Sequence, residues 1–402
     1  IPSNPEKFVS SGPMRGARSL VSLLITAVAV GSLLVLFKPE QRSQGSGQSD
    51  KNQSPEAYVE ETLGLRFKSA PVMIRVSKAV WLERVEEHLS AQFGPGGLAR
   101  RSRALELIGF HEFSGHSLKE GFSALHSIGL RGWLDSIEGA LLLAADFDET
   151  QPEDRVLLHG LLAEALIEQA SPTAIGQLSD DEWIAESALR ASISESIKAK
   201  LREEERESFL LPTPLLTERE SLLAGLPIYL AGLGELPQER GAARIFFETR
   251  LRTRSRTLLD LIENPPRSTL ELLGGDSSSI TPVILPSLAS DHANQLEESL
   301  GAFQVQTLIE WMESYEQAQA LALLWRGDRY RLFANSSGDH LIWLCRWETN
   351  TAAERASEIF AKLKDGLGRS TRFISSSVDG NTTTFTNCAD LQTQDLLLRP
   401  GR

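Results

Sequence analysis

Hydrophobic positions follow two different periods along this chain, and each period predicts its own kind of element. Residues 71–77 (PVMIRVS) are short, β-branched and roughly alternating, which predicts a strand. An amphipathic stretch with a serine cap follows over residues 78–93 and predicts a helix. Further helices are predicted over residues 98–108 and 118–128, and residues 139–147 (GALLLAADF) predict a second strand.

The most hydrophobic helical pattern covers residues 152–169 and leaves almost no polar face. A helix that is apolar nearly all round is expected at the centre of a domain. A long helix is predicted over residues 180–205, beginning at the cap formed by Ser179, and another over residues 218–233 despite Pro227. We expect both to pack on the central helix.

The last third of the chain mixes helical patterns with strand-like pieces, and no period repeats. Helical patterns cover residues 238–262, 296–316 and 351–363, and the strand-like pieces are residues 280–286 (ITPVILP), 329–334 (RYRLFA) and 340–347 (HLIWLCRW). The sequence therefore predicts an α+β fold in which helices dominate.

An uncharged segment near the N-terminus, residues 19–37, predicts a transmembrane helix. Its nineteen residues would span roughly 30 Å at about 1.5 Å per residue. A cleaved signal peptide would have a shorter apolar stretch followed by small residues, and a buried core helix would not be followed directly by polar, low-complexity sequence. The lipid bilayer is thus an expected partner of residues 19–37.

The charges on either side of this segment predict its orientation. Three basic residues precede it and two follow it, which favours a cytoplasmic arm over residues 1–18 and a domain outside the membrane. Residues 38–55 are rich in Gln, Ser and Gly and predict a flexible linker. The expected location is therefore the cell membrane, with a single pass.

The net charge of −13 excludes one class of partner. An anionic surface repels phosphate backbones, and no basic stripe with interleaved aromatic residues offsets it, so nucleic acid is not expected to bind. The two cysteines, Cys345 and Cys388, are too few for a disulfide framework and lack the spacing of a zinc ribbon. The sequence leaves open whether they pair.

The segment HEFSGH, residues 111–116, looks like a metal motif, because His-Glu-x-x-His on a helix places two imidazoles one turn apart. Here His111 and His116 are five positions apart, about 140° round a helix, and Ser114 and Gly115 disfavour a helix. We expect a loop rather than a metal site. The other histidines stand alone, and no GxSxG, GxxxxGK or GxGxxG motif is present.

Taken in order, several segments resemble a family of bacterial zincin-like metallopeptidases, which are often anchored in a membrane. Residues 63–77 resemble the family's entry strand, and residues 131–147 resemble its Gly-Phe-Tyr-Asp segment and the strand before the metal-binding helix. Residues 262–273 (IENPPRSTLELL) resemble a Pro-Pro-x-Ser-Thr element. Residues 325–333 and 341–360 resemble the closing Gly-Gly-Asp-Arg-Tyr and Trp-Asp-Thr blocks. The resemblance implies a zincin-like fold.

The resemblance also implies where metal ligands would lie. The family's metal helix carries His-Glu-x-x-His followed by Ala-Leu-x-Asp-Gln, and residues 157–169 (LLHGLLAEALIEQ) resemble its tail with ALIEQ. This register puts Gly160, Leu161 and Glu164 at the positions of the first histidine, the general-base glutamate and the second histidine. All three are replaced.

A second register, shifted by one residue, lets His159 stand for the first histidine. Gly160 and Ala163 then occupy the glutamate and second-histidine positions, so that neither register leaves a histidine pair. The family's third ligand is a glutamate on the following helix, and its position is taken by Ser194, with Glu195 adjacent but about 100° round the helix.

A catalytic zinc ion needs three protein ligands, an open position for water and a base, and the sequence supplies one or two candidates at most. We therefore expect no metal, cofactor or catalytic residue. The hypothesis is a pseudo-peptidase, a membrane-tethered domain that binds a polypeptide or an envelope component. One alternative is an active hydrolase whose atypical metal site uses Glu164, His159 or distant residues, and another is a structural envelope protein.

The expected organisation follows from these assignments. After the arm, the membrane helix and the linker, residues 56–205 form a zincin-like N-terminal lobe that contains the degenerate metal helix, residues 153–170. Residues 206–402 form a C-terminal lobe.

Overall fold

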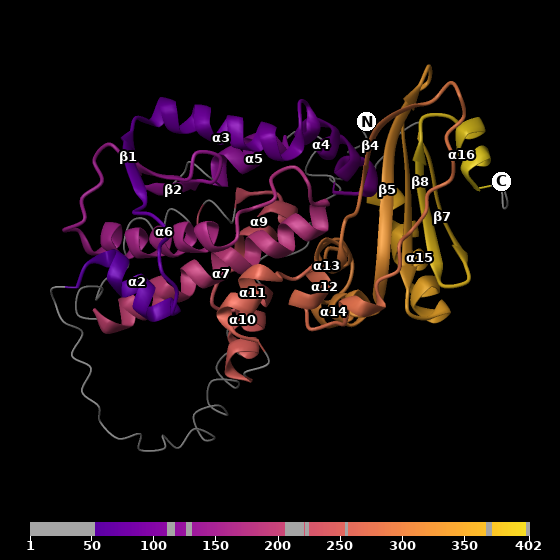
Figure 1. Ribbon diagram of the computed structural model, residues 1–402. Coiled ribbons are helices and arrows are strands. Elements are labelled where there is room, and N and C mark those ends of the chain that lie inside the picture. The colour runs from indigo at the N-terminus through magenta and orange to yellow at the C-terminus, as the bar shows by residue number, and fades with distance from the viewer. Residues whose placement is uncertain are drawn as a thin grey trace, which may run out of the picture. The chain divides into compact units, whose positions relative to one another are not determined.

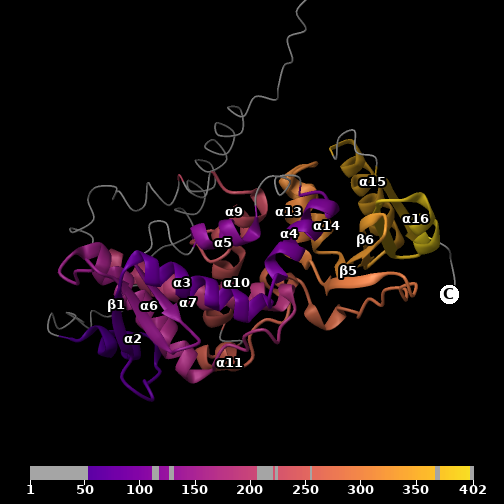
Figure 2. The same ribbon diagram turned by 90° about the horizontal axis from the view of Figure 1, so that it is seen from above.

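Two β-sheets and fourteen α-helices make up the part of the chain that the computed structural model describes, residues 53–110, 117–125, 131–205, 221, 225–253, 256–366 and 372–398. All of this part except Gln53 belongs to one compact unit, which begins at Ser54. Figures 1 and 2 show the small sheet beside the longest helices and the large sheet at the other end of this unit.

Strands β1 (Val72–Val76), β2 (Gly132–Asp135) and β3 (Ala140–Ala144) form the small sheet, in the order β1-β3-β2. Strand β1 runs parallel to β3, whereas β2 runs antiparallel to it. The central strand β3 is buried from Ala140 to Leu143, which matches its continuous hydrophobic sequence. Strand β2 is therefore an edge of this sheet.

Helix α6 (Pro152–Ala170) is the central helix that the sequence predicts, because eleven of its nineteen residues are buried. A proline opens it, and acidic residues follow in the first turn, where the helix dipole favours negative charge. Helix α7 (Asp180–Glu204) begins with a capping box between Ser179 and Glu182 and packs along α6. Helix α6 in turn packs against the edge strand β2.

Shorter helices surround this pair and link the two sheets. They are α2 (Pro55–Leu63), α3 (Lys78–Phe93), α4 (Gly97–Ile108), α5 (Leu118–Leu125), α9 (Ile228–Glu235), α10 (Ala242–Arg252), α11 (Leu258–Glu263), α12 (Thr269–Leu272), α13 (Ala302–Glu310) and α14 (Tyr315–Ala322), with one 3-10 turn at Ser277–Ser279.

The large sheet is antiparallel throughout, with the strand order β4-β5-β6-β8-β7. Helix α15 (Asn350–Gly366) packs on it, and the ring of Phe360 lies 4.7 Å from that of Trp343. Helix α16 (Leu391–Leu398) packs on β8. The strands are β4 (Ala293–Glu298), β5 (Trp325–Asn335), β6 (Gly338–Trp347), β7 (Phe373–Asp379) and β8 (Thr382–Cys388).

A buried ionic cluster joins α4 and α7 to the large sheet. The Nε atom of Arg101 lies 2.7 Å from Oδ2 of Asp180, and its Nη2 atom lies 2.9 Å from Oε1 of Glu298. Burial and the neighbouring Asp180 carboxylate raise the pKa of Glu298 to about 7. Two carboxylates thus share one guanidinium group in the interior.

Most predicted elements are confirmed and a few are wrong. The helix predicted over residues 78–93 is α3, and that over 152–169 is α6. Residues 238–262 form parts of two helices rather than one, and residues 280–286 form no strand. Residues 296–316 begin in strand β4, because pairing with β5 overrides the local helical pattern.

The expected fold class, a helix-dominated α+β domain behind one N-terminal transmembrane helix, is wrong. The described chain is a mixed α/β structure with two sheets, and none of its helices is long and apolar enough to cross a bilayer. An uncharged run can satisfy the length of a span, but hydropathy alone does not establish a helix. Residues 19–37, on which the expectation rests, lie outside the described residues.

Candidate functional site

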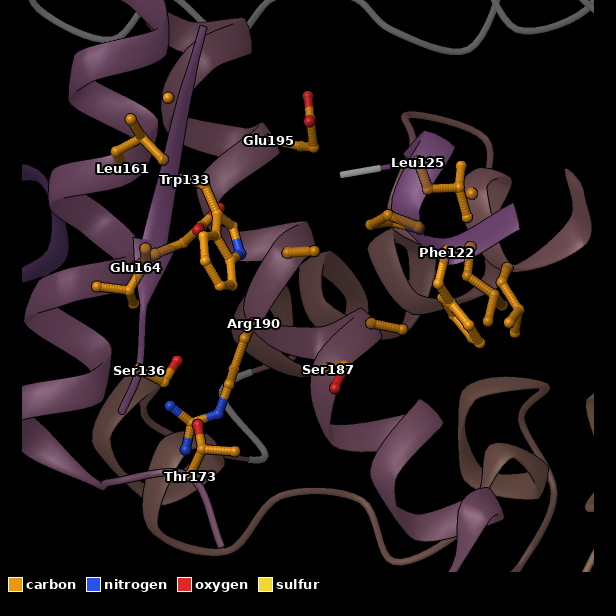
Figure 3. A pocket seen from close by; sticks show the side chains of 18 of the residues that line it. Phe122, Leu125, Trp133, Ser136, Leu161, Glu164, Thr173, Ser187, Arg190 and Glu195 are labelled. Atoms are coloured by element: carbon orange, nitrogen blue, oxygen red, sulfur yellow. The ribbon is translucent and has the colours of Figure 1, made fainter. Parts of the chain in front are cut away.

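A cleft of about 480 Å³ is lined by residues of β2, α3, α5, α6 and α7. Figure 3 shows Leu161 and Glu164 of α6 on one side of it and Phe122 and Leu125 of α5 on the other, with the Trp133 indole of β2 between them. A concave site with an apolar lining and a few polar groups is the usual form of a ligand site. This cleft is therefore the candidate functional site.

One wall of the cleft is aromatic. The ring of Phe93 stacks on that of Phe122 with centroids 5.8 Å apart and meets Trp183 edge-on at 5.1 Å. The ring of His88 meets Trp133 edge-on at 5.3 Å. Such a wall can hold hydrophobic or aromatic ligand groups by burying their surface.

Behind the opposite wall, α6 and α7 approach each other closely at Gly160, which does not itself line the cleft. A Cβ atom at this position would lie 2.9 Å from Oγ of Ser194 and 2.8 Å from both Cγ and Cδ of Lys198. The stem of Lys198 therefore fills the space beside the glycine. Gly160, which the first register matches to the first metal ligand, and Ser194, which takes the position of the third ligand in a separate match, are neighbours across the two helices.

Glu164 lies one turn further along α6 than Gly160 and lines the cleft. Burial raises the pKa of its carboxyl group, while the Lys198 ammonium and the Ser194 hydroxyl act in the opposite direction. The Lys198 ammonium is itself bound to Glu195, with 2.6 Å between Nζ and Oε1. None of the ion pairs among the described residues includes Glu164.

Two further cations near the cleft are held by acidic partners. Arg190 lies 3.3 Å from Glu168 and 2.7 Å from Glu186, and it donates a hydrogen bond to the Ser171 carbonyl. Arg131 lies 2.5 Å from Asp154, which is almost completely buried. Most of the positive charge around the cleft is thus committed to contacts within the protein.

Three polar groups in the lining each keep one buried atom without a hydrogen-bond partner in the described part of the chain. These atoms are Nδ1 of His88, Oε1 of Glu153 and Nε of Arg202. Burial lowers the pKa of His88, which favours the neutral form of its imidazole. Unpaired buried polar atoms cost free energy, which a bound ligand or water would recover.

His159, the candidate ligand of the second register, does not line the cleft. Its ring is buried against Tyr58 of α2 at 5.1 Å, and Nδ1 donates to the carbonyl oxygen of Arg155 at 2.7 Å. Burial lowers the pKa of this imidazole. The structure therefore does not bring His159 and Glu164 together as the atypical metal site would require.

The remaining candidates can be placed as far as the structure describes them. His111 and His116 lie outside the described residues. Within the described part, no three His, Cys, Asp or Glu side chains are grouped closely enough to hold a metal ion. Cys345 and Cys388 are both buried and both free.

No family model, curated protein or solved structure matches this chain. The resemblance to zincin-like peptidases therefore rests on the residues of this chain alone.

Sequence reasoning missed several groups that shape the cleft. Lys198 lies one turn beyond Ser194, so the helical period could have indicated that both face α6. His88 reads as a lone histidine, and Trp133 lies in a strand of only four residues. The contact between the His88 and Trp133 rings depends on how α3 packs near β2. No pattern within one segment of the sequence predicts that packing.

Proposed function

We propose that this chain is a non-catalytic counterpart of a zincin-like peptidase that binds an extended polypeptide segment in the cleft beside β2. The observation that carries this proposal is the contact between α6 and α7 at Gly160. The stem of Lys198 occupies the space that a side chain at this position would need. In the family that the chain resembles, a histidine at this position would bind the metal.

The shape and lining of the cleft support a polypeptide ligand. An edge strand forms part of the lining, and extended peptides commonly add to the edge of a sheet. The aromatic wall offers hydrophobic surface, while the opposite wall offers carboxylates. A cleft with both features suits a chain that carries mixed side chains. A location outside the membrane stays a prediction.

Metal analysis of the purified full chain tests the non-catalytic part of the proposal. We expect far less than one zinc ion per chain by mass spectrometry after dialysis against zinc. Stoichiometric zinc that disappears in a His159→Ala, Glu164→Ala double variant would instead support an active hydrolase.

Peptide retention tests the binding part. The immobilised chain should retain members of a degenerate decapeptide pool, and Ala191→Trp should reduce retention at least tenfold, because Ala191 lines the cleft. The matched control is Ala199→Trp, an exposed position on the same helix, which should leave retention unchanged. Equal loss in both variants, or no retention at all, would argue against a polypeptide site in this cleft.

A further inference from the structure

The charge of the cleft lining is unbalanced. Five acidic side chains line the cleft, but only three basic ones do. Because low-dielectric walls strengthen the field of such charges, an excess of carboxylates favours a cationic ligand group. The question is which carboxylate is available to meet that group.

The pairing of the lining charges leaves two lining carboxylates, Glu153 and Glu164, without an ion-pair partner among the described residues, and Glu164 is the one that lies deeper along α6. Lys198 is bound to Glu195, and Arg190 is shared between Glu168 and Glu186. Glu168 also accepts hydrogen bonds from the backbone and the hydroxyl of Thr173, at 2.8 and 2.6 Å. Glu164 has no such ion-pair partner among the described residues, although its side chain is only partly exposed.

A half-buried carboxylate without an ion-pair partner is unfavourable when its desolvation is only partly offset. Burial raises the pKa of Glu164, and the Lys198 ammonium and the Ser194 hydroxyl oppose this effect only in part. A ligand that brings a cation with several N–H donors would remove the cost. This requirement fits a guanidinium group better than a neutral polar group.

An aromatic side chain in the same cleft favours arginine over lysine. Trp133 and Glu164 both line the cleft, and Figure 3 shows the Trp133 indole in the space between α6 and α5. A planar guanidinium can stack on an aromatic face and at the same time pair with a carboxylate, whereas an ammonium group is a compact and strongly hydrated charge.

We infer that the cleft binds an arginine side chain of its polypeptide ligand, with the guanidinium group between the Glu164 carboxylate and the Trp133 indole. This inference rests on the proposed function and adds the residue that the site selects. Glu164, which resemblance to the family matches to a metal-binding histidine, thereby acts as a specificity-determining residue.

Paired peptide pools test the inference. One pool of degenerate hexapeptides has arginine fixed at the third position, and the other has citrulline there, which keeps the shape of arginine but has no charge. The immobilised full chain should retain the arginine pool at least tenfold better, as measured by mass spectrometry. Glu164→Gln should reduce arginine retention to the citrulline level and leave citrulline retention unchanged.

The matched control is Glu149→Gln, an exposed acidic position outside the cleft, which should keep the full preference. A second measurement needs no variant. Since the pKa of Glu164 is raised, the arginine preference of the unmodified chain should fall as the pH is lowered from 8 to 5. This pH measurement therefore tests the inference even if the Glu164→Gln variant does not fold.

The outcomes separate the two proposals. If neither pool is retained, the polypeptide-binding function itself is wrong. If both pools are retained equally, the cleft binds polypeptides without selecting arginine, and only the inference fails. Full arginine preference in Glu164→Gln, or a preference that does not change with pH, would show that Glu164 does not meet the guanidinium group.

Discussion

The carboxylate of Asp328 accepts a hydrogen bond of 2.9 Å from the indole Nε1 of Trp343 inside the large sheet. The backbone N–H groups of Leu300 and Gly301 and the hydroxyl of Ser299 also donate to it. Asp328 of β5 is therefore the common acceptor for donors from β6 and from the residues that lead into α13. It belongs to the segment that resembles the family's Gly-Gly-Asp-Arg-Tyr block.

Asp328→Asn should lower the free energy of unfolding by about 2 to 4 kcal/mol, because an amide group would place its own N–H donors against buried donors. Urea unfolding followed by circular dichroism measures this change. Asp379→Asn, an exposed position on β7, should change stability by less than about 0.5 kcal/mol. Similar effects in the two variants would contradict the role of Asp328.

The contact between Gly160 and Lys198 predicts a coupled effect on stability. Alanine is favoured over glycine inside a helix by about 1 kcal/mol, but a Cβ atom at Gly160 would meet the Lys198 stem at 2.8 Å. Gly160→Ala should therefore be more destabilising in the natural chain than in a Lys198→Ala background. A double-mutant cycle by urea unfolding should give a coupling of about 1 kcal/mol, and additive changes would exclude the contact.

The buried cluster at Arg101 predicts a dependence of stability on pH. The pKa of Glu298 is raised to about 7, above that of the unfolded chain, so the folded state binds the proton more tightly. The contribution of Glu298 to stability is complete below the pKa that its carboxyl group has in the unfolded chain. This contribution is lost as the pH rises through 7. Burial also raises the pKa of Asp181, to about 6, so that Asp181 acts in the same direction.

Glu298→Gln isolates this effect from those of other groups. The variant should unfold at nearly the same urea concentration as the natural chain at pH 5. At pH 8 it should be relatively more stable by about 1 to 3 kcal/mol, because glutamine avoids a second buried negative charge beside Asp180. A stability difference that stays constant with pH would rule out Glu298 as the titrating group.

The two cysteine thiols should be unreactive in the folded chain. Cys345 and Cys388 are fully buried, and burial raises the pKa of both thiols, that of Cys388 to about 12. Because the thiolate is the reactive form, Ellman's reagent should modify neither cysteine until urea unfolds the chain. Two thiols per chain should then react. Rapid modification under native conditions would contradict this burial.

Replacement of His159 should affect stability and leave the cleft intact. His159→Ala removes the packing against Tyr58 and the hydrogen bond to the Arg155 carbonyl, so we expect a loss of about 1 to 3 kcal/mol. Retention of the decapeptide pool should not change in the variant that remains folded. Loss of peptide retention without loss of stability would place His159 in the binding site.

The central helices were predictable because their own residues carry the necessary signals. Helix α6 is hydrophobic nearly all round, and α7 begins with a serine and a glutamate at the spacing of a capping box. These signals come from residues that are close together in the sequence, so they can be recognised without knowledge of the packing. The same residues therefore predicted the approximate bounds of the two helices on one side of the cleft.

The strands of the large sheet were only partly predictable. Strands β7 (FISSSVD) and β8 (TTTFTNC) are rich in serine and threonine and show no strong hydrophobic alternation. Strand β8 lies between β6 and β7, and Phe385 is buried against Phe360 of α15. Pairing and packing across distant parts of the chain decide these strands, and the sequence shows neither.

The candidate site also has features that were predictable from the sequence and features that were not. The resemblance to the family matches Gly160, Glu164 and Ser194 to positions of metal ligands, but the sequence could not show that the Lys198 stem lies beside Gly160. That contact depends on the distance between two helices. It also could not show that Glu195 holds the Lys198 ammonium, which leaves Glu164 without an ion-pair partner.

Helix α7 has polar anchors at both of its ends as well as contacts in the cleft. At its start Asp180 meets Arg101, and at its end Glu204 accepts a hydrogen bond of 2.9 Å from the Tyr58 hydroxyl. A helix of this length, about 37 Å, moves largely as a rigid rod. A ligand that shifts α7 near Lys198 therefore has to disturb one anchor about five turns away and another about two turns away. Amide hydrogen exchange should report occupancy of the cleft at β4 and α2, neither of which lines it.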